Sequence, residues 1–418
     1  MTRRVLRLGH LGDGITDDGL LARRVLPGEG IDGVAENGRI LKPKIIDPVE
    51  DRVKAPCRHY NSCGGCSLLH ASDSFVSAWK ASQVEAALGA RGIEVKARRI
   101  ATSPGRSRRR ASFTGRRGKS GALLGFHATA SAIVTEVPDC LVLDPAMTAV
   151  ADALKPMVAR LASRKGDLRV AVTLTENGPD VSISGAKPVD AKAGEALAAE
   201  AAAVGLSRLI VDGELMATLE APIISFDGIS VHLPAGAFLQ ATPHGEAALR
   251  QSVIEALGDA GRVLDLFSGC GTFALPLARR SAVHAVEGEP EMTKALIEGA
   301  SRAKGLKPVT GETRDLFRRP LLGDEMKAFN ALVMDPPRAG AEAQTAEIAK
   351  AGPPVVAMVS CNPVTFARDV ATLVSGGYAL NWVDVVDQFR WSPHIEIAAS
   401  LSRDPSSVPV HRELTFST

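Results

Sequence analysis

From about residue 245 onward, short apolar runs alternate with helix-length segments, and this alternation restricts the possible fold more than any other feature of the chain. It predicts a parallel sheet covered by helices on both faces. Ligands of such sheets bind at the carboxyl ends of the strands. We therefore assign residues 241–418 to one α/β domain. The alternating segments are 246–258 (helical), 262–267 (extended), 284–287 (extended), 292–305 (helical), 331–335 (extended) and 355–359 (extended).

The rest of the chain divides near residue 52. Residues 1–52 hold short extended runs cut by Gly, Pro and Asp, without helix-length periodicity, which predicts a small antiparallel β-barrel. Residues 53–240 mix a helical stretch with several extended runs, which predicts a central α+β domain. At 418 residues the chain is long enough for three domains that each bury a core.

Composition places the chain among folded globular proteins. Hydrophobic residues make up 45% and charged residues 23%, which excludes disordered and fibrous classes. The N-terminus lacks the apolar core of a signal peptide, and no window reaches about 18 uninterrupted apolar residues. We therefore expect a cytoplasmic protein without a membrane partner.

Charge is unevenly distributed, although the net charge of +2 is too small to indicate a partner. Residues 105–121 hold seven Arg or Lys and no acidic residue. Such a run suits contact with phosphate groups, and a solvated loop without function is an equally good interpretation of charge alone.

The predicted strands of the α/β domain end in residues that can do chemistry, namely Asp265, Glu287, Asp335 and Cys361. The first strand runs into Gly269 and Gly271, whose lack of a side chain allows a tight turn and a close approach of ligand to backbone. Glu287 follows about 20 residues later, where a carboxylate can accept hydrogen bonds from ribose hydroxyls.

This pattern favours S-adenosylmethionine over a dinucleotide, because Ala274 stands where a dinucleotide motif has its third glycine. An ordinary strand-to-helix turn is the alternative. Asp335 opens Asp-Pro-Pro, which fixes a carboxylate beside the pocket or forms a simple turn. Asp315 can lie near the adenine edge or cap a helix.

Cys361 ends a strand at the expected ligand edge, which favours a nucleophile over an inert buried thiol. Glu396 lies among apolar residues, so its pKa should be raised to a range that suits proton abstraction. A thiol, a base and a methyl-donor pocket together indicate methyl transfer to an unreactive carbon, because thiolate addition at carbon 6 of uracil makes carbon 5 nucleophilic. An edge-strand Glu without function is the competing interpretation.

With LDLFSGCGTF, DPPRAG, SCNP and HIE in this order, the chain resembles the RNA 5-methyluridine (uracil-C5) methyltransferase family. The resemblance covers nearly the whole chain and implies a Rossmann-like class I methyltransferase domain after an N-terminal TRAM-like OB barrel that binds RNA. It implies Cys361 as nucleophile and Glu396 as general base. It implies cofactor contacts by Phe267, Glu287 and Asp335, and by Gln240 in the Phe-x-Gln motif at 238–240.

The family also accounts for cysteines that a disulfide framework does not explain in a cytosolic chain. The cysteines at 57–66, spaced C-x5-C-x2-C, together with Cys140 resemble the four-thiolate [4Fe–4S] site of the ribosomal RNA members. Zinc is the alternative, and the spacing lacks the paired C-x2-C motifs of common zinc modules. The predicted cluster ligands are Cys57, Cys63, Cys66 and Cys140.

The chain departs from the family pattern at three places, which leaves the target nucleotide open. Phe389-Arg390 replaces Phe-Pro, Ala241-Thr242 lacks the usual Asn, and His127 follows Gly-Phe in place of Arg. We expect a uracil-C5 methyltransferase of structured RNA, ribosomal RNA before transfer RNA, with the basic run contacting RNA. The alternatives are a transfer RNA enzyme, a methyltransferase of different regiochemistry, and a non-catalytic iron–sulfur RNA-binding protein.

Overall fold

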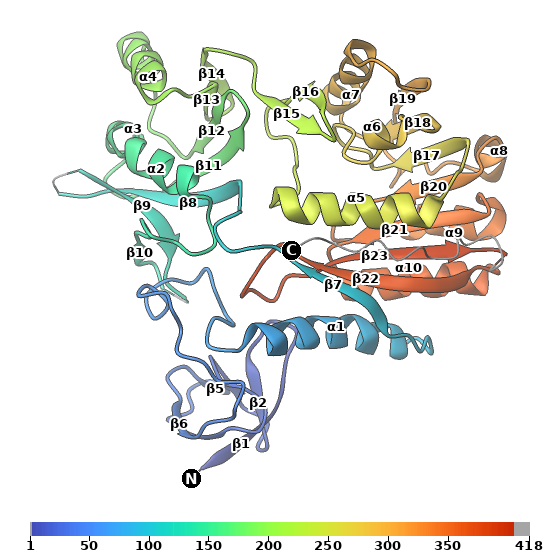
Figure 1. The fold of residues 1–418 in the computed structure, drawn as a ribbon. Coiled ribbons are helices and arrows are strands. Elements are labelled where there is room, and N and C mark those ends of the chain that lie inside the picture. The colour runs from blue at the N-terminus through green and yellow to red at the C-terminus, as the bar shows by residue number, and fades with distance from the viewer. Residues whose placement is uncertain (1, 120, 130, 405–418) are drawn as a thin grey trace.

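The computed structural model describes residues 2–119, 121–129 and 131–404, which form three regions along the chain (Figure 1). The first 47 residues form a six-stranded, mostly antiparallel sheet in the order β5-β3-β2-β1-β4-β6. Its strands are short and surround an apolar cluster that contains Val5, Ile31 and Ile40. The strands are β1 (Arg3–Leu8), β2 (Gly14–Thr16), β3 (Leu21–Ala22), β4 (Gly30–Asp32), β5 (Arg39–Ile40) and β6 (Lys44–Asp47).

The central region is a seven-stranded sheet, in the order β10-β9-β8-β11-β12-β13-β14, with three helices that pack into its apolar cluster. Each helix begins at a local signal: Asp144 and Asp190 cap α2 and α4, and Pro stands in the first turn of α2 and α3. The elements are β8 (Arg110–Arg117), β9 (Ala122–His127), β10 (Val134–Thr135), α2 (Pro145–Ala153), α3 (Lys155–Leu161), β11 (Leu168–Thr175), β12 (Gly178–Ser184), α4 (Ala191–Val204), β13 (Arg208–Val211) and β14 (Glu214–Thr218).

The third region confirms the predicted α/β layers. Its eight-stranded sheet has the order β19-β18-β17-β20-β21-β23-β22-β7, and strands β17 to β21 are parallel to one another. Alternate residues of β17 enter different cores: Val263 packs with α5 to α7 on one face, and Leu264 packs with α1 and α8 to α10 on the other.

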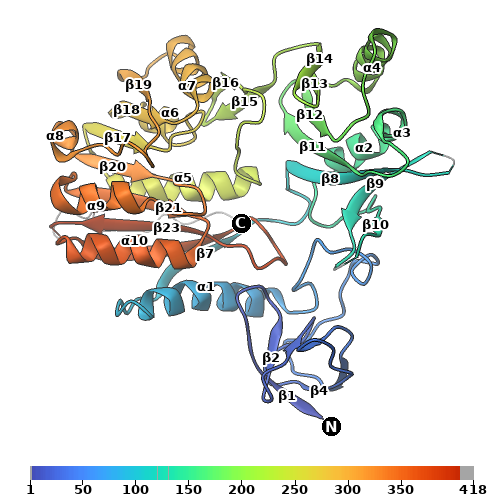
Figure 2. The same cartoon turned by 180° about the vertical axis from the view of Figure 1, so that it is seen from behind.

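Strands and helices of this region lie side by side in both views (Figures 1 and 2). The strands are β7 (Ala97–Thr102), β17 (Arg262–Leu266), β18 (Ala282–Glu287), β19 (Val309–Thr313), β20 (Ala331–Met334), β21 (Val355–Ser360), β22 (Ala379–Asp387) and β23 (Glu396–Ser402), with a hairpin of β15 (Ile223–Phe226) and β16 (Ile229–His232) before them. The helices are α1 (Asp73–Gly89), α5 (Pro243–Leu257), α6 (Ala274–Leu277), α7 (Pro290–Arg302), α8 (Gly323–Met326), α9 (Glu342–Ala351) and α10 (Pro363–Ser375).

Residues 73–102 form a helix and a strand of this third region, although the sequence analysis assigns them to the central domain at 53–240. Helix α1 packs against α10, and β7 adds to β22 as a parallel edge strand. Antiparallel β23 lies between β21 and β22. No helix among the described residues is long and apolar enough to cross a membrane.

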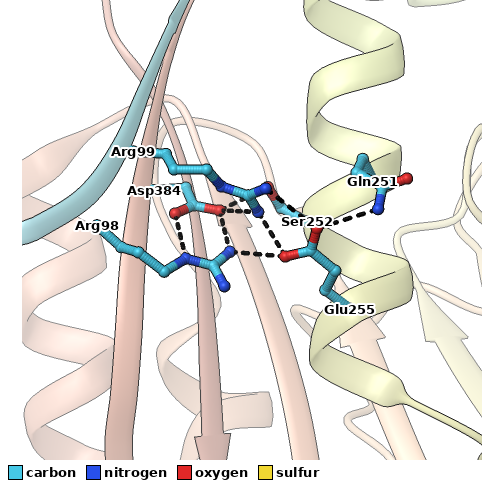
Figure 3. Close-up of polar contacts among 6 residues, drawn as sticks. All are labelled: Arg98, Arg99, Gln251, Ser252, Glu255 and Asp384. Carbon is cyan, nitrogen blue, oxygen red and sulfur yellow. Dashed lines mark hydrogen bonds and ion pairs between the residues drawn. The ribbon is translucent and has the colours of Figure 1, made fainter. Parts of the chain in front are cut away.

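An ionic network fixes β7 to the sheet and to α5 (Figure 3). Asp384 of β22 accepts hydrogen bonds from Arg98 Nε (2.9 Å) and Arg99 Nη2 (2.9 Å), and also from Ser252 Oγ (2.8 Å). Both arginines also bind Glu255. Burial raises the pKa of the Asp384 carboxyl, but the hydrogen bonds from the two arginines outweigh burial and lower it. The network therefore joins β7 to α5 and β22, whose contacting residues follow it by 156 to 286 positions in the chain (Figure 3).

Candidate active site at the carboxyl edge of the sheet

The turn after β17 takes the open shape expected for a ligand-binding loop. Phe267, Gly269 and Gly271 have φ values of 60°, 54° and 99°, in the left-handed region that a non-glycine residue rarely adopts. A Cβ on Gly271 would meet the Leu275 side chain at 2.7 Å, whereas a Cβ on Gly269 would meet nothing within 4 Å. A side chain at position 271 would therefore clash with Leu275, whereas Gly269 faces open space.

Glu287 lies at the end of β18 and is oriented by backbone amides. Its Oε2 accepts a hydrogen bond from Gly269 N at 2.8 Å, and its Oε1 accepts one from Glu289 N at 3.0 Å. The structure therefore brings the predicted carboxylate to the predicted glycine turn. One more carboxyl, Asp265 of β17, is fully buried beside them, and neither of its oxygens has a hydrogen-bond partner at bonding distance in the described residues.

Asp335 follows β20 and contacts Gln240. Gln240 Nε2 donates to Asp335 Oδ2 at 3.3 Å, and Gln388 Nε2 donates to Gln240 Oε1 at 2.5 Å. Burial raises the pKa of Asp335 to about 7. Burial also raises the pKa of Asp265 well above its usual range, and the neighbouring Asp335 and Glu287 charges raise it further.

Cys361 and Glu396 lie together because β21 and β23 are neighbours. Ser360 pairs with Ile397, so the residue after β21 faces the first residue of β23. The pKa of Glu396 is raised to about 8, by burial first and then by the Asp335 charge, while Gln388 and Arg110 act in the opposite direction. The pKa of the Cys361 thiol is raised to about 11, by burial first and then by the Glu396 charge. The expected raised pKa of Glu396 is confirmed.

Two residues at this site were not among the site residues predicted from the sequence. Gln388 follows β22 directly, and its Oε1 accepts a hydrogen bond from Ala241 N at 2.7 Å. Arg110 comes from the central region, and its guanidinium lies 4.2 Å from the ring centre of Phe238. Both act on Glu396: Gln388 lies shortly before it in the chain, whereas Arg110 comes from the distant central region, and only the folded structure shows that Arg110 reaches it.

Asp315 caps a turn instead of facing the other carboxyl groups. Its side chain is 47% exposed, and Oδ1 accepts hydrogen bonds from Phe317 N (3.0 Å) and Arg318 N (3.2 Å). The capping role is the alternative that the sequence leaves open. Phe317 packs against Phe267 with ring centres 5.5 Å apart, so the Asp315 turn lies beside the turn that follows β17.

The four predicted cluster cysteines line one cavity of about 210 Å³. The pKa of Cys66 is raised to about 12, by burial first and then by the charges of Cys140, Cys63 and Cys57, which reflects their proximity. In the described part of the chain, no three His, Cys, Asp or Glu side chains are arranged around one point as a metal-ion site. The four thiols therefore surround a space and do not converge on a single position.

The basic run at 105–121 does not form one solvated surface over its described residues. Arg109 is buried and pairs with Glu246 while its Nε donates to the Gln240 carbonyl. Arg116 pairs with Asp167, and Arg108 lines the cysteine cavity. Three of the seven cations, Arg108, Arg109 and Arg110, are therefore used inside the protein or at the two sites, which the sequence run alone could not reveal.

A second cluster of positive charge lies where the N-terminal sheet meets the cysteine loop. A groove of about 570 Å³ is lined by five basic side chains and by no acidic one. Arg24 donates to the Tyr60 carbonyl, and Arg52 pairs with Glu29. The other three have no ion pair in the described ranges; we call Arg23, Lys42 and Lys54 the free cations of the basic groove.

Known proteins of similar sequence and fold have related activities. A family model described as tRNA (Uracil-5-)-methyltransferase matches residues 302–404. An uncharacterized RNA methyltransferase of Rhizobium meliloti is 42% identical over 410 residues, which cover 95% of this chain and 98% of the relative. The 23S rRNA (uracil(1939)-C(5))-methyltransferase RlmD of Shewanella piezotolerans is 30% identical, covering 96% of this chain and 95% of that protein.

Among solved structures, the Pyrococcus abyssi tRNA (uracil-54, C5)-methyltransferase in complex with S-adenosyl-L-homocysteine superposes with a TM-score of 0.75. It is 21% identical and covers 96% of this chain and 99% of that structure, which establishes a shared fold. The family assignment rests on the relatives of 30% identity or more, which match this chain over nearly its whole length. The chain therefore belongs to the S-adenosylmethionine-dependent RNA (uracil-5-)-methyltransferase family.

Proposed function

We propose that this protein methylates carbon 5 of a uracil in ribosomal RNA, with Cys361 as the nucleophile and Glu396 as the general base. One observation carries the proposal: a half-buried thiol and a buried carboxyl of raised pKa face each other across two adjacent strands. A methyltransferase that modifies nitrogen or oxygen has no need of a thiol at that position. The pairing is what thiol-dependent activation of a pyrimidine requires.

The proposed chemistry begins when the Cys361 thiolate forms a bond to carbon 6 of the uracil. The electron pair of the 5,6 double bond then moves toward carbon 4 and its oxygen, which makes carbon 5 nucleophilic. S-adenosylmethionine would supply the electrophilic methyl group, which bonds to carbon 5 as S-adenosylhomocysteine leaves. Glu396 removes the proton from carbon 5, the 5,6 double bond re-forms, and the bond to the Cys361 sulfur breaks. The thiolate is thereby regenerated.

The cofactor would be held by the residues that the sequence predicts, namely Gln240, Phe267, Gly269, Gly271, Glu287, Asp315 and Asp335. Two observations support the fit. Gly269 faces open space, and the carboxyl of Asp265 is buried without a hydrogen-bond partner at bonding distance in the described residues. Buried carboxyl groups with raised pKa favour a cationic ligand, because a positive charge stabilises their ionised forms.

The RNA substrate would present its target base unstacked, since carbon 6 is not accessible within a helix. Ribosomal RNA is favoured over transfer RNA because the RlmD relative, whose name states a 23S rRNA uracil, is 30% identical along its length. The N-terminal sheet, expected to be a TRAM-like RNA-binding barrel, would contribute through the free cations of the basic groove. Three unpaired basic side chains around an open groove suit a phosphodiester backbone.

The four cysteines would hold a [4Fe–4S] cluster. A single zinc ion needs sulfurs about 2.3 Å from one point, whereas a four-iron cluster takes one thiolate at each iron and so needs thiols spread around a space. A cavity of about 210 Å³ lined by Cys57, Cys63, Cys66 and Cys140 fits the second arrangement. Such a group would cross-link residues 57–66 to Cys140; its redox chemistry is not needed for the proposed methyl transfer.

The deciding experiment uses RNA in which 5-fluorouridine replaces uridine. Fluorine at carbon 5 cannot be abstracted as a proton, so after methyl transfer the enzyme and the methylated RNA should remain covalently joined through Cys361. Ribosomal and transfer RNA are tested separately. The Cys361→Ala variant should form no adduct and the Cys270→Ala variant should still form one. Absence of an adduct from every RNA with the native protein would contradict the proposal and favour a non-catalytic RNA-binding role.

A further inference from the structure

The segment between β22 and β23, residues 388–395, spans from the reaction centre to the cysteine cavity. Its first residue, Gln388, binds the Gln240 amide and the Ala241 backbone, and the segment leads directly into Glu396. Both ends of the segment therefore lie at the proposed reaction centre. Its middle residue, Trp391, lies elsewhere.

Trp391 is held by the cysteine side of the molecule. Its carbonyl accepts hydrogen bonds from Ser67 N and Leu68 N, both at 2.9 Å, and these amides directly follow Cys66. Its indole lines the cysteine cavity, and Nε1 donates to Asp73 Oδ1 at 3.0 Å. Trp391 also has a φ of 61°, a conformation that an aromatic residue keeps only where its surroundings enforce it.

The flanking residues leave the segment little freedom to absorb a shift at Trp391. Lys80 is fully buried and donates to Asp387 Oδ1 at 2.5 Å and to the Phe389 carbonyl at 3.2 Å. Arg390 Nη2 donates to Asp73 Oδ2 at 2.5 Å. The segment is therefore fixed at its start, at Arg390 and at Trp391. A displacement of Ser67 and Leu68 would move Trp391, and the short stretch of chain on either side of it would transmit the shift to Gln388 and Glu396.

We propose that Trp391 is a positioning residue that couples the arrangement of the four-cysteine cavity to Gln388 and Glu396. Disturbing the cavity would then slow methyl transfer by misplacing the general base and leave RNA affinity largely intact. The inference rests on the proposed function for the identity of the base. The physical coupling itself can be measured without any catalysis.

The first measurement is hydrogen exchange of residues 388–395 in the full-length protein, purified without oxygen. The Cys66→Ala variant should exchange this segment about tenfold faster than the native protein, while β12 of the central sheet should not change. The matched control is Ser62→Ala, which alters the same loop at a residue outside the cavity lining. Unchanged exchange at 388–395 in Cys66→Ala would overturn the coupling.

The second measurement separates kcat from KM. Trp391→Ala should lower kcat about tenfold with KM for RNA nearly constant, because a misplaced base affects the transition state and not RNA binding. Trp391→Phe keeps an aromatic ring at the cavity and should recover most of kcat even though it loses the contact to Asp73. A rise in KM alone, or no recovery with Phe, would overturn the positioning role. Failure of native protein to methylate any RNA would instead count against the proposed function, and the exchange result would stand.

Discussion

Glu396 is the residue on which the proposed chemistry most depends, and its neighbours shift its pKa in opposite directions. Burial and the Asp335 carboxyl favour its protonated form, while Arg110 and Gln388 favour its ionised form. The balance raises its pKa to about 8, so a large fraction of the free enzyme holds this carboxyl protonated at neutral pH. A base of this pKa is strong enough to take a carbon-bound proton once that proton has become acidic.

The pH dependence follows from this value. Because Glu396 must be ionised to act and Cys361 must be a thiolate, kcat/KM should rise with pH through the Glu396 pKa of about 8 and continue to rise toward the Cys361 pKa of about 11. A bound cationic cofactor should lower the pKa of the neighbouring carboxyl groups, so the rise in kcat should lie at lower pH than the rise in kcat/KM. A rate profile over this range checks both statements. A rise confined to pH above about 10 would point to Cys361 as the titrating group.

Replacing Glu396 by Gln should separate adduct formation from product release. Gln cannot remove the proton from carbon 5, so the methylated RNA should remain attached to Cys361 and turnover should fall about 10²- to 10⁴-fold. Denaturing gels with ordinary uridine RNA should show a covalent complex in the variant and little in the native protein. Free methylated RNA produced at the native rate would exclude Glu396 as the base.

At the residue scale, sequence patterns located the groups that end strands. Cys361, Glu287 and Asp335 could be predicted because a strand followed by a turn places its last residue at the ligand edge. Arg110 and Gln388 could not, because their importance comes from contacts between segments more than 100 residues apart in the chain. Asp265 could be predicted as a strand-end carboxyl. Only the structure shows that it is buried and that its oxygens have no hydrogen-bond partner at bonding distance within the described residues.

At the scale of elements, the placement of β7 is the main feature that periodicity did not predict. Residues 97–102 read A-R-R-I-A-T, and a strand with two adjacent arginines does not resemble a buried strand of a parallel sheet. It pairs with β22 because Asp384 and Glu255 supply the compensating charges (Figure 3). The alternation after residue 245 correctly predicted β17, β18, β20 and β21, but it did not predict β19.

We expect Asp384→Ala to destabilise this edge of the sheet. The Asp384 side chain is 2% exposed and accepts hydrogen bonds from both arginines and from Ser252. Its removal leaves two arginine charges sharing Glu255, which should lower the free energy of unfolding by about 2–4 kcal/mol. Since the pKa of Asp384 is lowered by folding, its stabilisation is present above the carboxyl's unfolded-state pKa and is lost as pH falls through the folded-state value.

Denaturant unfolding of the full chain near neutral pH measures the effect. The matched control is Asp167→Ala, which breaks an ion pair with Arg116 in which both side chains are about one third exposed. That loss should cost about 1 kcal/mol or less, because water screens exposed pairs. Equal destabilisation by the two variants would show that the network around β7 is no stronger than a surface ion pair.

At the scale of the whole molecule, the basic groove lies at the junction of the N-terminal sheet with the cysteine loop, on a different region from Cys361. Its lining includes Cys57 and Tyr60 as well as residues of the sheet, so RNA bound there would contact two regions at once. Arg23, Lys42 and Lys54 have no ion pair within the described ranges, which leaves their charges available to phosphates. RNA affinity and methyl transfer should therefore depend on separate parts of the protein.

Replacing the three free cations by Ala should weaken RNA binding without changing cofactor binding. Each phosphate contact contributes about 0.7–0.9 to the slope of log affinity against log salt, so the loss of three should reduce that slope by about two. Titrations of RNA at several salt concentrations measure the slope, and calorimetry measures the affinity for S-adenosylmethionine. The matched control removes Arg164, Lys165 and Lys187, three exposed cations at turns of the central region. If the control triple lowers the slope equally, the N-terminal groove has no special part in RNA binding, and net charge alone governs the affinity.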